Sequence, residues 1–98
     1  MSEIKITRED KGSKARYVAR VAGIDGEGEL TLSILSNDTV IADHTEVPDS
    51  MRRQGVALAL VERLVADARE QEFQIVPLCP FVRAQSVKHQ EWTDVIQA

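Results

Sequence analysis

The sequence predicts an α+β fold: an antiparallel meander of strands, a long helix that crosses over to a parallel strand, and short C-terminal helices. Three observations support this. Apolar and polar residues alternate through much of residues 4–47, which is typical of strands covered on one face. Over residues 54–71 the apolar residues recur at three- and four-residue steps, as in an amphipathic helix. A compact apolar run, 73–78, then follows the helix.

Each strand of the first half has its own alternating pattern. Ile4 and Ile6 alternate with polar residues and indicate a short edge strand. Leu30, Leu32 and Ile34 share one parity and indicate a strand with one buried face. Glycine- and asparagine-containing segments separate these runs as turns. The expected strands span residues 4–7, 15–22, 29–35 and 39–47.

The second half changes period. Pro48 ends the strands, and the helix over 54–71 leads into the apolar run 73–78. A strand–helix–strand order favours a right-handed crossover and parallel pairing. Pro80 can begin a short helix that continues to residue 89. Trp92, Val95 and Ile96 then supply a last apolar patch.

Composition narrows the class of protein. The 98 residues are expected to form one domain, 1–98, and the net charge of −4 argues against a general nucleic-acid binder. One cysteine excludes an internal disulfide, which suits a reducing compartment. The first residues carry no apolar leader, and no apolar run approaches membrane-spanning length. We therefore expect a cytoplasmic protein that binds neither nucleic acid nor membrane.

A basic, glycine-containing segment lies between the last strand of the meander and the long helix. The start of a helix presents backbone N–H groups without intrahelical partners, together with partial positive charge. Such a start binds phosphate, and a glycine lets the ligand approach the backbone closely. The alternative is an ordinary solvated turn with a helix cap and no ligand. We call this segment, residues 52–57, the elbow; it comprises Arg52, Arg53, Gln54, Gly55, Val56 and Ala57.

Several motifs together resemble a known family. Arg52-x-x-Gly55-x-Ala57, after a strand and before a helix, is similar to the acyl-CoA pyrophosphate motif of the GNAT N-acetyltransferases. The wider pattern resembles the minimal, single-domain branch of that superfamily over residues 30–96. It adds His44-Thr45-Glu46-Val47, Val76-Pro77-Leu78-Cys79-Pro80-Phe81-Val82 and Lys88-His89-x-Glu91-Trp92.

The resemblance implies a GNAT-like fold and acetyl-CoA, a form of coenzyme A, as co-substrate. The elbow N–H groups would hold the diphosphate of the cofactor. The backbone of Thr45, Glu46 and Val47 would pair with the pantetheine arm between two splayed strands. The implied activity is transfer of an acetyl group to a small amine or a lysine. The alternatives are a non-catalytic CoA or acyl-CoA-binding module that acts with a partner protein, and an interaction domain that has lost the ligand.

Cys79 and His44 are the candidate catalytic residues. Cys79 lies between two prolines where a helix is expected to start, and such a position can make a thiol more nucleophilic. It would carry the acetyl group transiently or simply pack beside the thioester; most lone cysteines are small buried hydrophobes. His44 would act as general base, because a neutral imidazole accepts protons near neutral pH. The alternative is a histidine of the core or sheet surface that makes one hydrogen bond and has no catalytic role. Glu46 is a weaker candidate base.

Other residues carry less weight. A metal site from His44, Cys79 and His89 matches no compact ligand spacing, so no metal is expected. Lys88 is read as a solvated helix end, with contact to adenosine as the alternative. Larger relatives often use a late tyrosine as acid for the leaving thiolate, whereas the one tyrosine here, Tyr17, lies in an early strand. The acceptor therefore stays open. We expect a monomer or a weak dimer formed through an exposed sheet edge.

Overall fold

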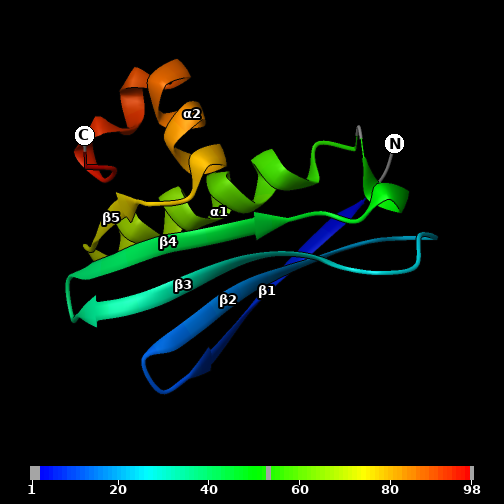
Figure 1. Cartoon of the computed structure of the whole chain (residues 1–98), viewed down its shortest axis with the longest axis horizontal. Helices are drawn as coiled ribbons and strands as arrows, with labels where there is room; N and C mark the ends of the chain where they lie inside the picture. Colours follow the sequence, from blue (N-terminus) through cyan, green and yellow to red (C-terminus); the bar gives the residue numbers. More distant parts are fainter. Residues whose placement is uncertain (1–2, 53, 98) are drawn as a thin grey trace.

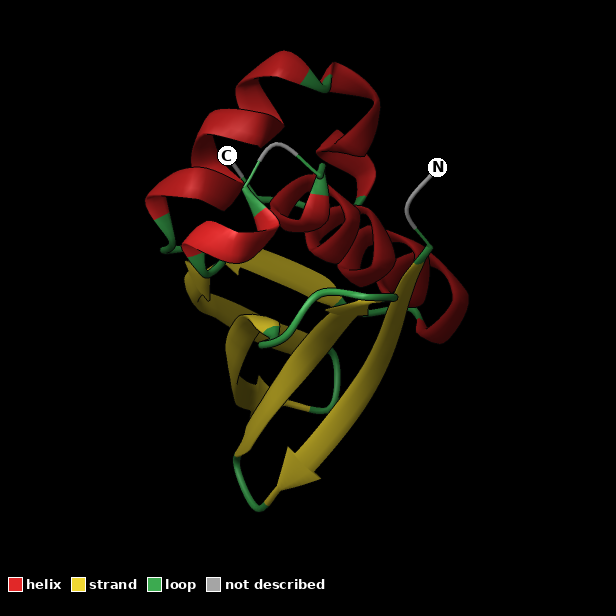
Figure 2. Cartoon of the chain, turned by 90° about the vertical axis from the view of Figure 1, so that its right-hand side faces the viewer, coloured by secondary structure: helices red, strands yellow, loops and turns green. Residues whose placement is uncertain are grey.

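The computed structural model describes residues 3–52 and 54–97 and shows one mixed sheet with the helices gathered on one side (Figures 1 and 2). The five strands lie side by side in chain order, β1 to β5. The first four pair antiparallel, and β5 runs parallel to β4. The strands are β1 Ile4–Lys11, β2 Lys14–Val21, β3 Gly28–Ser36, β4 Thr39–Glu46 and β5 Gln74–Pro77.

The helical segments follow β4. The chain leaves β4 through a short 3₁₀ turn, Asp49–Met51, and enters the long helix α1, Val56–Gln71. Helix α1 returns the chain to β5, which leads into α2, Pro80–Lys88, and a final 3₁₀ turn, Gln90–Asp94. This confirms the predicted meander, the crossover through a central helix, the parallel step and the short C-terminal helices. No helix among the described residues is both long and apolar enough to cross a membrane.

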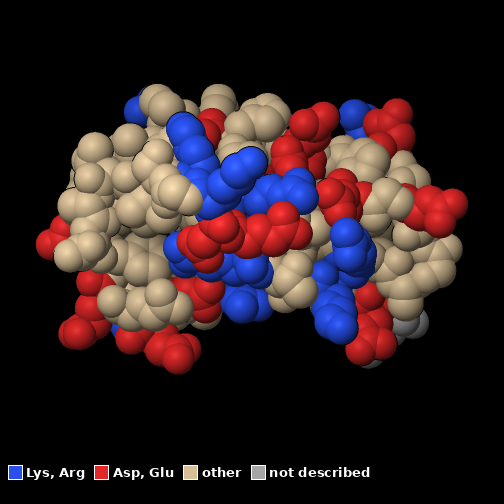
Figure 3. Space-filling view, turned by 90° about the horizontal axis from the view of Figure 1, so that it is seen from below, with Lys and Arg blue, Asp and Glu red and all other residues tan. Residues whose placement is uncertain are grey.

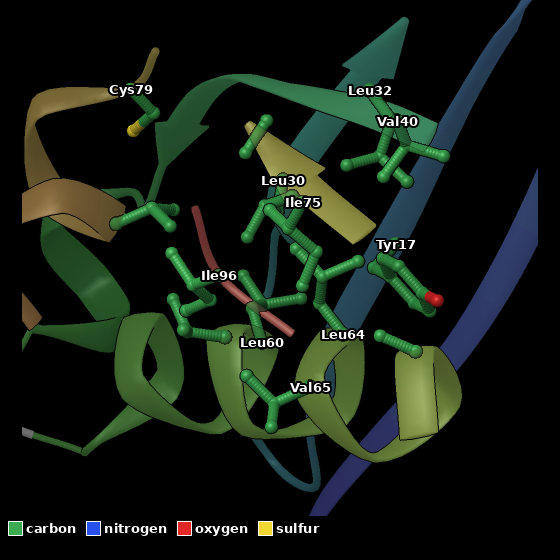
Figure 4. Close-up of a cluster of buried hydrophobic side chains, with 14 of the residues drawn as sticks. Tyr17, Leu30, Leu32, Val40, Leu60, Leu64, Val65, Ile75, Cys79 and Ile96 are labelled. Carbon is green, nitrogen blue, oxygen red and sulfur yellow. The ribbon is translucent and has the colours of Figure 1, made fainter. Parts of the chain in front are cut away.

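The core lies between α1 and the sheet (Figure 4). Leu60 and Leu64 on α1 are fully buried, as are Leu30 and Leu32 on β3. Burial of such side chains is the main favourable term in folding, so the three- and four-residue spacing determines which face of α1 meets the sheet. The predicted C-terminal patch is also buried and comprises Trp92, Val95 and Ile96. Its chain closes part of the outer edge of β5, where the Ile75 N–H donates to the Val95 carbonyl over 2.7 Å.

Two element boundaries differ from the prediction by more than one residue. β1 continues to Lys11 and pairs with β2 along its whole length, instead of ending after Thr7. Its second half is held by cross-strand pairing and by charge, as in the 3.0 Å ion pair between Arg16 and Glu9, and so lacks an apolar pattern. Helix α1 begins at Val56, two residues later than expected, because Gly55 adopts a left-handed conformation with φ 75°.

Charges of both signs cover the sheet face that carries no helix; Figure 3 shows the molecule from below. Arg16 lies between Glu9 and Glu29, with a distance of 2.8 Å from its Nη1 to the nearer Glu29 oxygen. On the same face of β2, Val18 is only 2% exposed although no helix covers it. The register places Val18 opposite Glu29. On this face, charged side chains therefore cover the apolar side chain of Val18.

A buried polar cluster joins α1 to the sheet. The Tyr17 hydroxyl on β2 donates to Asp67 Oδ2 on α1 over 2.6 Å, and Arg63 Nε donates to Asp67 Oδ1 over 3.2 Å. Arg8 donates to the Tyr17 oxygen from β1 over 3.4 Å. Burial, followed by the hydrogen bond to the Asp67 carboxylate, raises the pKa of Tyr17 well above its ordinary value. Strands β1 and β2 are thereby fixed to the second half of α1.

Replacement of Tyr17 by phenylalanine tests this cluster. Tyr17→Phe removes the 2.6 Å hydrogen bond to the buried Asp67 carboxylate and leaves only the longer bonds from Arg63. We expect the free energy of unfolding to fall by about 1–3 kcal/mol in urea denaturation. In the wild-type protein the raised pKa of Tyr17 stabilises the fold fully below about pH 10. That contribution is lost as pH rises toward the folded-state pKa, and Tyr17→Phe lacks this alkaline component. Equal stability of the two proteins at neutral pH would contradict the role of the cluster.

Candidate functional site

β4 and β5 stay together for only four residues and then part. Their pairing runs from Thr39 opposite Gln74 to Ala42 opposite Pro77. One further hydrogen bond follows, from the Cys79 N–H to the Ala42 carbonyl over 2.7 Å. The chain then turns into α2, while β4 continues beside β3 (Figure 1). Residues 43–46 therefore have no strand on their β5 side within the described chain, which leaves about 13 Å of strand edge at 3.3 Å per residue. We call this opening the fork.

A β-bulge in β4 determines which side chains face each side of the fork. The register shifts between Thr31 opposite His44 and Leu32 opposite Ala42, so Asp43 is an extra residue on β4. Because paired side chains lie on the same face, Thr45 shares the helix-covered face with Leu30. His44 shares the open face with Thr31. The bulge thus places two neighbouring residues of the predicted site on opposite faces of the sheet.

Cys79 lies at the base of the fork on the helix side (Figure 4). It is only 2% exposed, and its Sγ is 3.3 Å from Thr45 Oγ1, so the two side chains meet across the opening. Cys79 is also the N-cap residue of α2, and its carbonyl accepts from the Arg83 N–H over 3.0 Å. The predicted position at a helix start is confirmed, and the buried sulfur forms part of the fork wall.

His44 faces the other way. Its side chain is 63% exposed, and its Nε2 lies 3.9 Å from Glu46 Oε2 on the same open face. The Thr31 hydroxyl donates to the His44 carbonyl over 3.3 Å, which supports the bulge. The structure therefore does not bring His44 and Cys79 together: they lie on the two sides of one opening. His44 can receive a proton only from a group that reaches the fork from the open face.

The elbow forms one wall of a groove beside the end of β4. Gly55 has φ 75°, and a Cβ built on it would have no atom within 4 Å, so the space in front of it is open. The N-cap residue of α1 is Gly55, which makes no side-chain capping hydrogen bond, and the first turn carries no acidic residue. The partial positive charge of this helix end is therefore uncompensated within the helix. The groove measures about 350 Å³ and is lined by Val47, Met51, Arg52, Gly55, Val56, Ala57, Leu58 and Phe81.

A family comparison agrees with this geometry. The model of a GCN5-related N-acetyltransferase family matches residues 16–95, which covers most of the 98 residues. The chain belongs to this family. No curated protein matches the chain. For a family member, the parting of β4 and β5, the helix start and the groove are the features that the sequence resemblance implies for an acyl-CoA site.

Of the two arginines of the elbow, only Arg52 lies among the described residues. Arg52 is exposed and forms a 2.8 Å ion pair through Nε with Asp49, also exposed. Such a surface pair is worth little and leaves Arg52 at the rim of the groove. Arg53 lies outside the described residues, so its predicted contact with the cofactor stays a prediction. Gln54 precedes Gly55 and is half-buried.

Two residues beyond the predicted set shape this candidate site. Phe81, on α2, lines the groove together with residues of the elbow. It stands in the motif at 76–82, but only the folded chain brings it beside Val47. Gly28, on β3, is required for packing, because a Cβ there would lie 2.9 Å from Val56 Cγ1. No local pattern separates this glycine from the loop glycines at 23 and 26.

The remaining chemical groups lie elsewhere. Tyr17 is buried against Asp67, away from the fork, and is unavailable as an acid for a leaving thiolate. His89 stacks on Trp92 with ring centroids 4.1 Å apart, and its Nδ1 is 3.0 Å from Glu91 Oε2. Among residues 3–52 and 54–97, no group of three or more His, Cys, Asp or Glu side chains is arranged to hold a metal ion.

Substitution of Gly55 tests its left-handed backbone conformation, because the space around a Cβ at this position is open. We expect Gly55→Ala to lower the free energy of unfolding by about 1–2 kcal/mol, because alanine at φ 75° is strained. Gly55→Asn should cost less, since asparagine tolerates the left-handed region. The measurement is urea denaturation of both variants. If alanine proved as stable as glycine, the left-handed conformation at this position would be wrong.

Proposed function

We propose that the protein is an acetyl-CoA-dependent N-acetyltransferase whose acceptor is a primary amine, either a small molecule or a lysine side chain. The observation that carries the proposal is the continuity of the groove with the fork. Val47 directly follows β4 and lines the groove, while residues 43–46 lead from there to Cys79. A long thioester with an anionic end matches a positively polarised groove that opens into an unpaired strand edge.

The elbow is the binding end for the cofactor. The N–H groups at the start of α1 would hold the diphosphate, because the N-cap residue, Gly55, has no side chain to bond them itself. Arg52 at the rim adds positive charge. The open space at Gly55 allows close approach of phosphate, and Phe81 supplies an apolar wall. From there the pantetheine arm would follow Val47, Glu46 and Thr45 as an added strand.

The acceptor would approach from the open face of the sheet. Its nitrogen attacks the thioester carbonyl carbon, the carbon–sulfur bond breaks, and the bonding pair leaves on the CoA sulfur. The proton lost by the amine passes to His44, the exposed imidazole on that side of the fork. The Glu46 carboxylate, 3.9 Å away, stabilises the imidazolium that forms. Cys79 serves as a wall beside the thioester, because its sulfur is buried and contacts Thr45.

Binding at the elbow can be tested by adding a charge that does not harm the helix. Ala57→Glu places a carboxylate in the first turn of α1, where it favours the helix but repels a phosphate. We expect calorimetry to show CoA affinity reduced about tenfold or more, with thermal stability unchanged or higher. Ala66→Glu makes the same change on the exposed side of α1 and should leave the affinity unchanged. Equal affinity in both variants would place the cofactor elsewhere.

The two candidate catalytic residues make opposite predictions. Release of CoA thiol from acetyl-CoA is measured with a set of primary amines, including free lysine and lysine-containing peptides. We expect His44→Ala to lower turnover by about 10²–10⁴-fold with CoA affinity retained. We expect Cys79→Ala to keep most of its turnover.

The reverse result would identify Cys79 as a covalent carrier: lost turnover in Cys79→Ala, with an acetyl adduct on Cys79 in the intact mass of the wild-type protein. Binding of CoA without transfer to any amine would instead support the non-catalytic CoA-binding module.

A further inference from the structure

The outer edge of the sheet at β1 carries unpaired backbone groups. β1 is the first strand of the sheet, and β2 is the one strand of the described chain that pairs with it. The Ala22 N–H donates to the Glu3 carbonyl over 3.2 Å, so the Glu3 backbone faces β2. Successive residues alternate in direction. The backbone groups directed away from β2 therefore belong to Ile4, Ile6, Arg8 and Asp10.

A contact from α1 supports this assignment. Arg63 Nη1 donates to the Ile6 carbonyl over 3.2 Å, which requires that carbonyl to face away from β2. A carbonyl oxygen has two lone pairs, so Ile6 can still accept a bond from another strand. The free edge thus retains donors and acceptors along its length. Such an edge is a template for a further strand.

The exposed side chains along this edge identify that strand. Five exposed residues of the open face alternate with the outward-directed ones: Glu3, Lys5, Thr7, Glu9 and Lys11. A second copy of the strand that runs antiparallel presents the same five residues in the opposite order. Each acidic residue of one copy then faces a lysine of the other. From this self-complementarity we infer that β1 pairs with β1 of a second copy of this chain about a two-fold axis at Thr7. The dimer is isologous, with one continuous sheet across both copies.

The charges select a single register. With the axis at Thr7, Lys5 faces Glu9 of the partner subunit, and Glu3 faces Lys11 of the partner subunit. An axis at Ile6 sets Glu3 against Glu9 of the partner subunit, and an axis at Arg8 sets like charges together at two levels. Axes at Lys5 or Glu9 place that residue against its own copy. Opposite charges across a strand pair stabilise it and like charges destabilise it, so the Thr7 register is favoured.

The in-chain contacts of these residues are compatible with pairing. Glu9 uses Oε1 for Arg16, and its second oxygen is available for a lysine. No ion pair is recorded within the described chain for Glu3, Lys5 or Lys11. Charged side chains, especially lysine, and proline commonly protect an edge against association, because they meet no matching partner there. Here each lysine has its matching carboxylate on the same strand, so the edge favours pairing.

The dimer leaves the fork free. β1 and β5 are at opposite ends of the sheet, so the two forks would lie at the far ends of the joined sheet. Self-association is therefore independent of the proposed cofactor and is measured without it. The failure of either proposal leaves the other intact.

Charge reversal with complementary mixing tests the dimer by sedimentation velocity over a concentration series at low salt. The wild-type protein is expected to self-associate. Lys5→Glu and Glu9→Lys should each raise the dimer dissociation constant at least about tenfold, because each sets like charges together twice. An equimolar mixture of the two variants should associate again, since every facing pair in the heterodimer is then opposite in charge. Lys88→Glu, on α2, changes the net charge by the same amount as Lys5→Glu and should associate like the wild type.

The outcomes decide the question. A wild-type protein that stays monomeric up to roughly 1 mM would overturn the inference. So would variants that associate as well as the wild type, or a mixture that does not regain association although both variants are folded by circular dichroism. Because exposed charge pairs are screened, added salt should weaken wild-type association.

Discussion

The candidate site depends on the early end of β5. Pro80 fixes its own φ and restricts the residue before it to extended backbone, and Cys79 accordingly has φ −62° and ψ 126°. A proline in the first turn favours a helix start, so the chain turns into α2 directly after Cys79. β5 therefore cannot follow β4 beyond Ala42, and the fork opens there. One local restriction on the backbone thus exposes the strand edge along which a cofactor arm can pair.

The bulge in β4 gives that edge two different sides. If β4 were a regular strand with Asp43 paired like its neighbours, His44 would lie on the same face as Val40 and Ala42, which are buried on the helix side. With it, His44 faces solvent and Thr45 turns inward toward Cys79. In the proposed function, a cofactor held on the helix side and an acceptor that arrives from the open face would meet at the fork. The two substrates would then bind on opposite faces of the sheet.

The sequence predicted the helices and strands better than it predicted which side chains of β4 lie on each face of the sheet. The spacing in α1 and the alternation of Leu30, Leu32 and Ile34 follow from burial against one layer, so periodicity alone was enough for these elements. The bulge has no such signature, because Asp43 and His44 look like two ordinary positions of an alternating strand. The sequence also missed the second half of β1, which is held by backbone pairing and by ion pairs across the hairpin with β2, as between Glu9 and Arg16, and not by an alternating apolar pattern. Phe81 shows the same limit, because its place in the groove depends on the direction of α2.

Helix α1 connects the site to the rest of the fold. Its first residue, Val56, packs so close to Gly28 on β3 that no side chain fits there. Its second half is fixed to β2 by the hydrogen bond between Asp67 and Tyr17. With both parts of the helix held against the sheet, the N–H groups of its first turn keep their position relative to the end of β4. A site fixed in this way loses little conformational freedom when a ligand binds, so more of the interaction energy is retained as affinity. The helix that would present the binding groups in the proposed function is also the main element of the core, so binding at the groove would depend directly on the packing of α1 against the sheet.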